Sequence, residues 1–335
     1  MDYTLLGKTG LLISKIGFGG IPVQKDTQDE ANALIDAVIA AGINYIDTAR
    51  AYTVSEALIG NALAGRREKF VIATKSTART AEAMAADIET SLKNLKTDYI
   101  DIYQVHNPSK DQLDTVLAPG GAIDALRKAK ADGRIGHIGI TAHSAEVLDY
   151  AIECGAFETA MFPYNIVETQ GEGLINKCAE RGIGFIGMKP LAGGAIENGF
   201  EALRFVLANP AVTVVIPGMY SPAEVAENCA AVRKMAGYDP EKSEYVKKIR
   251  SELTGNFCRR CNYCAPCTVG IPIPSVFLFE GYLSRYGLEG WARQRYETVK
   301  VKASECIGCG VCETRCPYEL PIREMMAKAA AEFGE

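Results

Sequence analysis

Short apolar stretches alternate along the first 238 residues with longer segments in which apolar residues recur every three or four positions. The short stretches have the length of buried β-strands, and the longer segments have the periodicity of amphipathic helices. The alternation predicts strands at residues 16–20, 43–46, 70–74, 99–105, 135–141, 159–162, 184–188 and 212–216. The predicted helices are 29–41, 55–63, 80–95, 122–131, 145–153, 172–181, 198–207 and 222–235.

Eight strand–helix units in sequence favour a closed (β/α)₈ TIM barrel of parallel strands joined by right-handed crossovers. A doubly wound open sheet is the alternative. That fold carries a glycine-rich phosphate-binding turn after its first strand, and Gly17-Phe-Gly-Gly20 does not match it. We also expect residues 4–15 to form a lid hairpin ahead of the first strand, and residues 108–121 to form a loop.

The pattern changes after residue 238. A charged helical segment, 240–253, leads into two dense runs of cysteines, and the stretch 276–295 between them is helix-like and aromatic. We therefore predict an α/β barrel at residues 1–238, followed at residues 239–335 by a small, mainly helical ferredoxin-like domain.

Composition and charge exclude several classes of protein. The net charge of −5 and the absence of a basic patch give no reason to expect a nucleic-acid partner. No apolar run approaches the roughly 20 residues needed to cross a bilayer, and the start of the chain lacks a secretion signal. We expect a cytoplasmic protein with no membrane partner.

The eleven cysteines are unevenly distributed. Cys154, Cys178 and Cys229 stand singly in helical patterns, where buried structural thiols are common. The other eight form the runs C-x2-C-x2-C-x2-C and C-x2-C-x2-C-x3-C-P, and in a reducing compartment dense cysteines indicate metal rather than disulfides.

The second run is the ferredoxin signature for [4Fe-4S] clusters, and neither run has the long spacer of a zinc ribbon, which is the alternative. In this signature the fourth cysteine binds the other cluster. The first run departs from it, because Thr268 stands where proline is expected. The rule predicts two [4Fe-4S] clusters, one held by Cys258, Cys261, Cys264 and Cys316 and the other by Cys267, Cys306, Cys309 and Cys312.

Four polar residues lie at the ends of three consecutive predicted strands. Asp47 and Tyr52 follow the second strand, Lys75 follows the third and His106 follows the fourth. Singly, a strand-end lysine is commonly solvated and a lone histidine is commonly a hydrogen-bonded core residue. Together they would lie on the catalytic face of the barrel.

Physical chemistry gives these four residues complementary roles. A phenol with a pKa of about 10 becomes an acid–base group near neutral pH only if a cation favours its ionised form, and Lys75 could supply that cation. Asp47 would hold the ammonium, and His106 could hydrogen-bond a carbonyl oxygen. Such a set suits protonating an oxygen while a hydride arrives at its carbon.

Six short motifs lie in the predicted barrel domain, and some of them include these residues. They are Leu6-Gly-Lys-Thr-Gly-Leu11, Asp47-Thr-Ala-x-x-Tyr52, Ala73-Thr-Lys75, Asp101-x-Tyr-x-x-His106, Pro190-Leu-Ala-Gly-Gly194 and Ile216-Pro-Gly218 with Glu227-Asn228. With these motifs the barrel resembles the aldo-keto reductases. The resemblance implies that Tyr52 is the general acid, that Lys75 and Asp47 tune it, that His106 positions a small-molecule carbonyl substrate, and that NAD(H) or NADP(H) binds without a Rossmann domain.

The implied cofactor pocket departs from the family pattern. Thr141-Ala142 replaces the usual Ser-Asn, Met161 replaces a common Gln, and Met188 stands where an aromatic residue commonly stacks on nicotinamide. Gly218 and Glu224 occupy positions where many members carry basic residues for the 2′-phosphate, so we expect NADH to be favoured over NADPH. The implied cofactor-binding residues are Gly20, Asp47, Thr141, Asn165, Met188, Pro190, Leu191, Ile216, Gly218, Glu227 and Asn228.

The combination of such a barrel with a two-cluster module resembles a subfamily of these reductases and leaves three hypotheses open. In the first, the clusters exchange electrons with a redox partner protein or with the substrate of the reductase. In the second, the cysteine-rich module is structural, redox-sensing or partner-docking, and the barrel is an ordinary reductase or binds nucleotide. In the third, the clusters feed a radical or dehydrating reduction. Clusters carry single electrons whereas nicotinamide carries a hydride, and no flavin site is evident to convert between them.

Overall fold

The computed structural model describes residues 1–335 and divides into two units. The first unit comprises residues Met1–Asn165, Thr169–Leu191 and Asn198–Pro240. The second comprises Glu241–Glu335 together with two short earlier segments, Ile166–Glu168 and Ala192–Glu197. The sequence pattern did not indicate that these two segments group with the C-terminal part of the chain.

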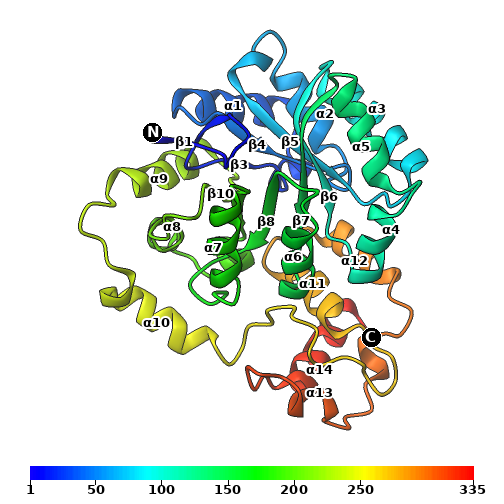
Figure 1. Cartoon of the computed structure of the whole chain (residues 1–335). Helices are drawn as coiled ribbons and strands as arrows, with labels where there is room; N and C mark the ends of the chain where they lie inside the picture. Colours follow the sequence, from blue (N-terminus) through cyan, green and yellow to red (C-terminus); the bar gives the residue numbers. More distant parts are fainter. The chain divides into compact units, whose positions relative to one another are not determined.

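The first unit is built on eight parallel strands, which appear in Figure 1 with helices on their outer side. Neighbouring strands pair in chain order from β3 to β10, and the predicted (β/α)₈ barrel is confirmed. The strands are β3 (Phe18–Gly19), β4 (Tyr45–Asp47), β5 (Val71–Ser76), β6 (Ile100–His106), β7 (Ile135–Thr141), β8 (Thr159–Pro163), β9 (Gly184–Met188) and β10 (Val214–Ile216).

Backbone hydrogen bonds between the first and last strands close the barrel. Gly17 N donates to Val215 O at 2.8 Å, and Gly19 N donates to Pro217 O at 3.0 Å. Two parallel bridges, Ile16 to Val215 and Gly19 to Gly218, mark the same seam. Closure leaves no exposed sheet edge, and it brings the carboxyl ends of all eight strands to one end of the barrel.

Nine helices belong to this unit, and the sequence pattern missed one of them. Residues 108–121 were expected to form a loop, but Lys110–Leu117 is helix α4. Its start carries a capping box, in which Gln112 N donates to Ser109 Oγ and Ser109 N donates to Gln112 Oε1. The other helices are α1 (Gln28–Ala40), α2 (Ser55–Ala62), α3 (Ala81–Leu95), α5 (Ala122–Ala131), α6 (Ala145–Glu153), α7 (Glu172–Arg181), α8 (Gly199–Leu207) and α9 (Pro222–Arg233).

An antiparallel hairpin of β1 (Tyr3–Leu5) and β2 (Leu12–Ser14) precedes the barrel. At its turn, Lys8 N donates to Gly182 O at 2.8 Å, and the side chain of Leu6 is fully buried in the core inside the barrel. Because Gly182 lies just before β9, the hairpin covers the amino ends of the strands. The expected lid therefore closes the end of the barrel opposite to the predicted catalytic residues.

The second unit is mainly helical, as predicted. Its apolar core includes Val276, Met326 and the parallel pair Tyr296 and Phe333, whose ring centroids are 3.7 Å apart. No helix of the chain is both long enough and apolar enough to cross a membrane. The helices of this unit are α10 (Glu244–Leu253), α11 (Ile273–Ser284), α12 (Glu289–Glu297), α13 (Val311–Thr314) and α14 (Ile322–Phe333). Single 3₁₀ turns in the chain lie at Pro22–Lys25, Arg67–Lys69, Ala192–Gly194, Pro240–Lys242 and Ala303–Glu305.

Candidate active site and thiol sites

Three adjacent strands carry the predicted acid–base residues at their carboxyl ends. Asp47 is the last residue of β4, Lys75 lies one residue before the end of β5, and His106 ends β6. Tyr52 lies in the loop between β4 and α2. The parallel register places Lys75 beside Gln104 of β6, so the polar side chains of these strands reach the same end of the barrel.

Asp47 and Lys75 form a buried ion pair, with residue exposures of 3% and 2%. Lys75 Nζ donates to Asp47 Oδ1 and also to the carbonyl oxygen of Thr48 at 2.7 Å. The second carboxylate oxygen, Oδ2, accepts a hydrogen bond from Gln104 Nε2 at 3.1 Å. Both oxygens of Asp47 are therefore hydrogen-bonded, which offsets part of the cost of removing the two charges from water.

Burial and mutual attraction act on this pair in opposite directions. Burial lowers the pKa of Lys75 below its ordinary value, and the negative charge of Asp47 opposes that change. Burial likewise raises the pKa of Asp47, against the attraction of Lys75 and the hydrogen bond from Gln104. Each charged form therefore depends on its partner for stability.

Tyr52 and His106 are partly exposed beside the buried pair. Lys75 Nζ lies 4.9 Å from the centroid of the Tyr52 ring. The rings of Tyr52 and His106 meet edge to face, with centroids 6.1 Å apart and an angle of 87° between their planes. The structure thus brings the four predicted residues into one group, in which two are buried and two are accessible from outside.

A second polar network fixes the loop that carries Tyr52. Arg50 N donates to Lys75 O at 3.0 Å, and Arg50 Nη1 donates to Glu56 Oε2 at 2.9 Å. Glu56, only 1% exposed, also accepts hydrogen bonds from Thr74 Oγ1 and Ser91 Oγ, both at 2.8 Å. This network connects the loop to α2, to β5 and to α3.

The sequence interpretation missed two supporting residues, Gln104 and Glu56. Gln104 is a polar residue in an otherwise apolar strand, two positions before His106, and alternation along a strand places the two on the same face. Glu56 follows Tyr52 by four residues in the first turn of α2. For Gln104 the available signal was a single polar residue inside an apolar strand predicted to be buried, whereas the sequence pattern carried no such signal for Glu56.

The predicted cofactor-binding residues lie largely around the same end of the barrel. Thr141 and Asn165 are buried there. Thr141 Oγ1 accepts from Asn107 N at 3.0 Å, and Asn165 Nδ2 donates to Lys189 O at 2.9 Å. Nine of the predicted residues end or follow strands of the barrel, namely Gly20, Asp47, Thr141, Asn165, Met188, Pro190, Leu191, Ile216 and Gly218.

Glu227 and Asn228 instead lie inside α9, where Asn228 is buried and Glu227 is exposed. Glu224 lies in the first turn of the same helix, and its Oε2 accepts from Tyr220 N at 2.9 Å. The carboxylate that is expected to disfavour a 2′-phosphate is therefore held by a hydrogen bond near the start of α9.

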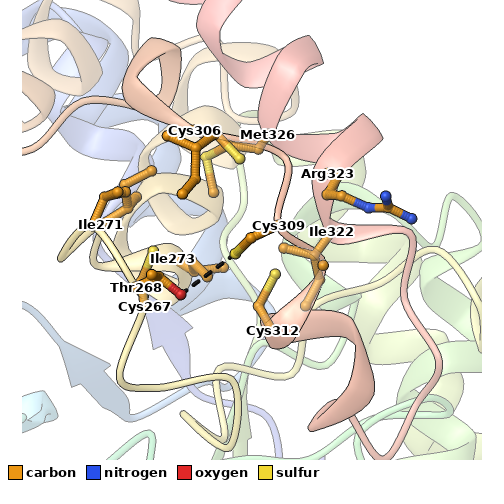
Figure 2. Close-up of a pocket in the computed structure, with 13 residues that line it drawn as sticks. Cys267, Thr268, Ile271, Ile273, Cys306, Cys309, Cys312, Ile322, Arg323 and Met326 are labelled. Atoms are coloured by element: carbon orange, nitrogen blue, oxygen red, sulfur yellow. Dashed lines mark hydrogen bonds between the residues drawn. The ribbon is translucent and has the colours of Figure 1, made fainter.

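Eight cysteines of the second unit line two cavities, with four cysteines at each. One cavity is lined by the first three cysteines of the first run together with Cys316. The other is lined by the first three cysteines of the second run together with Cys267, and Figure 2 shows these four thiols facing a common space. Each set draws its fourth member from the other run, which is the grouping that the ferredoxin rule predicts. The sets are Cys258, Cys261, Cys264 and Cys316, termed the inner site, and Cys267, Cys306, Cys309 and Cys312, termed the outer site.

The donor chemistry of both sites fits an iron–sulfur cube, because each offers four thiols between apolar walls. Ile273 and Ile322 line both cavities. The inner site includes Cys264, which is 8% exposed, whereas Cys306 and Cys309 of the outer site are exposed. The thiols of the inner site are therefore the more buried set.

Burial also separates the protonation behaviour of the thiols. It raises the pKa of Cys264 to about 12, so this thiol is protonated near neutral pH and must release its proton when it binds metal. The pKa of Cys309 is instead lowered, chiefly by the hydroxyl of Thr268, whose Oγ1 lies 3.4 Å from Cys309 Sγ.

Comparison with known proteins agrees with both halves of the structure. Residues 15–202 match the model of the aldo/keto reductase family, and residues 257–321 match that of a 4Fe-4S dicluster domain. The chain belongs to the aldo/keto reductase family. It is an oxidoreductase of that family with a 4Fe-4S dicluster domain in its C-terminal part.

Relatives and solved structures match most of the chain. It is 29% identical to L-galactose dehydrogenase of Arabidopsis thaliana over 302 residues, which cover 74% of this chain and 94% of that protein. It is 25% identical to 6-dehydroglucose reductase of Novosphingobium aromaticivorans, covering 68% of this chain and 89% of the relative. The holo form of aldo-keto reductase AKR11C1 from Bacillus halodurans superposes with a TM-score of 0.66 at 26% identity, covering 74% of this chain and 96% of that one.

We predict that Asp47→Asn lowers the free energy of unfolding of the barrel by about 3 kcal/mol, because it leaves the Lys75 ammonium buried without a carboxylate. Adding Lys75→Met should recover most of that loss. Urea denaturation followed by circular dichroism would measure both. Asp132→Asn, which breaks the exposed pair of Asp132 with Lys128, is the matched control and should cost less than about 1 kcal/mol. Equal costs for Asp47→Asn and Asp132→Asn would contradict the prediction.

Proposed function

We propose that the barrel reduces the carbonyl group of a small molecule, using a hydride from a nicotinamide cofactor and a proton from Tyr52. The observation that carries this proposal is the position of Lys75 Nζ, which is 4.9 Å from the centre of the Tyr52 ring and is bound by Asp47. A fixed cation beside a phenol favours its ionised form and makes the phenol a stronger acid. Tyr52 can then give its proton to a carbonyl oxygen as that oxygen becomes an alkoxide.

The remaining residues of the group position the reactants. Asp47 and Thr48 hold the ammonium of Lys75, and Gln104 holds Asp47. The ring centroids of His106 and Tyr52 are 6.1 Å apart, so a substrate oxygen bound beside the phenol would also lie near the imidazole. His106 would hydrogen-bond that oxygen and fix its orientation.

We propose that the strand-end residues around this group hold NAD(H) in preference to NADP(H). When bound, nicotinamide supplies the hydride. Asn165 and Thr141 would bind its carboxamide side, and Met188 would contact the ring through its thioether. Glu224, held by Tyr220 N near the start of α9, places a negative charge where a 2′-phosphate would need a cation.

In the C-terminal unit, we propose that the inner and outer sites each hold one [4Fe-4S] cluster and exchange electrons with a redox partner protein. When bound, such clusters supply one-electron transfer. The exposed thiols Cys306 and Cys309 make the outer site accessible from solvent. Cys264 of the inner site is instead buried.

A second function is possible for the C-terminal unit, because nicotinamide and iron–sulfur clusters carry electrons differently. Nicotinamide transfers a hydride and clusters transfer single electrons, and the converter that commonly joins them is a flavin. The alternative is a reductase whose cluster module is structural, redox-sensing or partner-docking. In that case hydride transfer continues without electron exchange between the two kinds of cofactor.

Tyr52→Phe should lower kcat/KM for carbonyl reduction by about 10²- to 10⁴-fold, the usual contribution of a general acid, while NADH binding stays unchanged. An NADH oxidation assay over aldehydes, ketones and sugars would measure this. Sugars belong in the panel because two relatives are named for acting on them. Tyr3→Phe, in the hairpin at the opposite end of the barrel, is the control. Full activity of Tyr52→Phe would remove Tyr52 from the proposed role.

Fluorescence titration should give a lower Kd for NADH than for NADPH. Glu224→Gln keeps an oxygen that can accept from Tyr220 N but removes the charge, so the ratio of the two Kd values should narrow by about threefold. Glu180→Gln, which removes a charge from α7, should leave the ratio unchanged. Tighter binding of NADPH by the unaltered protein would overturn the proposed preference.

Cys309→Ser separates the two functions of the C-terminal unit. If that unit is structural or regulatory, NADH-dependent carbonyl reduction should persist in the folded Cys309→Ser variant.

A spectroscopic experiment on the unaltered protein tests electron exchange. If electrons pass between nicotinamide and the clusters, NADH as the only reductant should produce the electron paramagnetic resonance signal of reduced clusters in the anaerobic, reconstituted protein. A silent spectrum with NADH, together with a strong one after dithionite treatment, would count against electron exchange with nicotinamide.

A further inference from the structure

The inner thiol site lies beside a buried arginine whose hydrogen-bond partners are neutral. Arg259 is 5% exposed and lines the inner cavity. Its Nε donates to Val167 O at 2.8 Å, and its Nη1 donates to Thr254 O at 3.2 Å and to Phe257 O at 3.3 Å. Backbone carbonyls therefore hold the guanidinium in place without cancelling its charge.

Aromatic packing holds the other side of this group. The guanidinium carbon of Arg259 lies 3.9 Å from the centroid of the Tyr318 ring, and Tyr318 also lines the inner cavity, two residues after Cys316. A planar guanidinium stacked on a ring has little freedom to turn toward solvent. Its position beside the inner site is thus set from two sides.

A second arginine of the same loop leaves the local balance positive. Arg260 forms an ion pair with Glu168, whose side chain is fully buried. Arg259 and Arg260 together carry two positive charges, and this glutamate carries one negative charge. The surroundings of the inner site therefore retain the positive charge of Arg259, since a guanidinium stays protonated in proteins.

The outer site has no equivalent. Its lining includes one arginine, Arg323, whose side chain is 54% exposed. Arg323 Nε donates to Glu313 Oε2 at 2.8 Å, so a carboxylate compensates its charge directly. Figure 2 shows the guanidinium end of Arg323 directed away from the thiols. Solvent and pairing both reduce its effect on the outer site.

We propose that Arg259 makes the inner site the more easily reduced of the two cluster sites. Reduction adds one electron to a cluster and makes it more negative, and a buried cation close by lowers the free energy of that charge. The lining of the outer site contains no buried cation of this kind, since its one arginine, Arg323, is exposed and paired with a carboxylate. Electrons supplied to the unit therefore collect at the inner site. This inference rests on the proposed function, in which both sites hold [4Fe-4S] clusters.

The test is a dithionite titration of the anaerobic, reconstituted full chain at set potentials, followed by electron paramagnetic resonance. Arg259→Gln should lower the ratio of reduced to oxidised inner cluster at a given potential by about tenfold, which for one electron equals about 59 mV. Arg259→Lys should retain most of the original ratio. Arg323→Gln is the matched control and should leave the inner site unchanged. Repeating the titration in a Cys306→Ser background, where only the inner site keeps all four thiols, assigns the signal.

A variant of opposite sign separates the effect of charge from the effect of disturbed structure. Glu168→Gln removes the negative charge and should raise the reduced fraction of the inner cluster. Two outcomes would overturn the inference. In one, Arg259→Gln and Glu168→Gln shift the ratio of reduced to oxidised inner cluster in the same direction. In the other, Arg259→Gln has full iron and sulfide content and an unchanged ratio. If Arg259→Gln fails to take up iron, the Glu168→Gln variant tests the inference instead: a higher reduced fraction of the inner cluster supports it, and a lower or unchanged fraction contradicts it. Failure of the unaltered protein to take up iron and sulfide would instead refute the proposed function.

Discussion

The buried ion pair of Asp47 and Lys75 is the interaction on which the candidate active site depends. Two opposite charges inside a barrel are costly to desolvate, and they persist because Thr48 and Gln104 supply the remaining hydrogen bonds. These contacts join β4, β5 and β6 in one register. Successive side chains on a strand face opposite sides, so a slip of one residue in β5 would direct Lys75 toward the helices instead. The pair is thus a constraint on the barrel as well as a source of positive charge for Tyr52.

The C-terminal unit handles charge differently from the barrel. In the barrel, the carboxylate of Asp47 pairs directly with the buried ammonium of Lys75. Beside the inner thiol site, backbone carbonyls and an aromatic ring hold Arg259 and leave its charge available. The first arrangement fixes the position of an ammonium group, whereas the second maintains an electrostatic field at a site where negative charge would accumulate.

The sequence was sufficient to predict the barrel, because strand and helix periodicities differ clearly and eight strand–helix units follow one another, with one longer loop expected at residues 108–121. It also indicated that Asp47, Lys75 and His106 would lie at one end, since parallel strands share their carboxyl ends. Helix α4 was missed because Pro108 and the glycines at 120 and 121 suggested a loop, although Ser109 and Gln112 carried a capping signal. Gln104, Glu56 and the grouping of segment 166–168 with the C-terminal unit depend on contacts between distant residues, which periodicity does not report.

The network around Glu56 ties the geometry of the active-site loop to the integrity of the scaffold. The carboxylate of Glu56 accepts a hydrogen bond from Arg50 in the loop that carries Tyr52, and it also accepts hydrogen bonds from Thr74 of β5 and Ser91 of α3. Local opening of α2 would therefore release the loop at the same moment as it exposes the core beneath it. Substitutions of Glu56 would therefore lower stability and activity together. In a mutational scan of this protein, loss of fitness at Glu56 would reflect both effects at once.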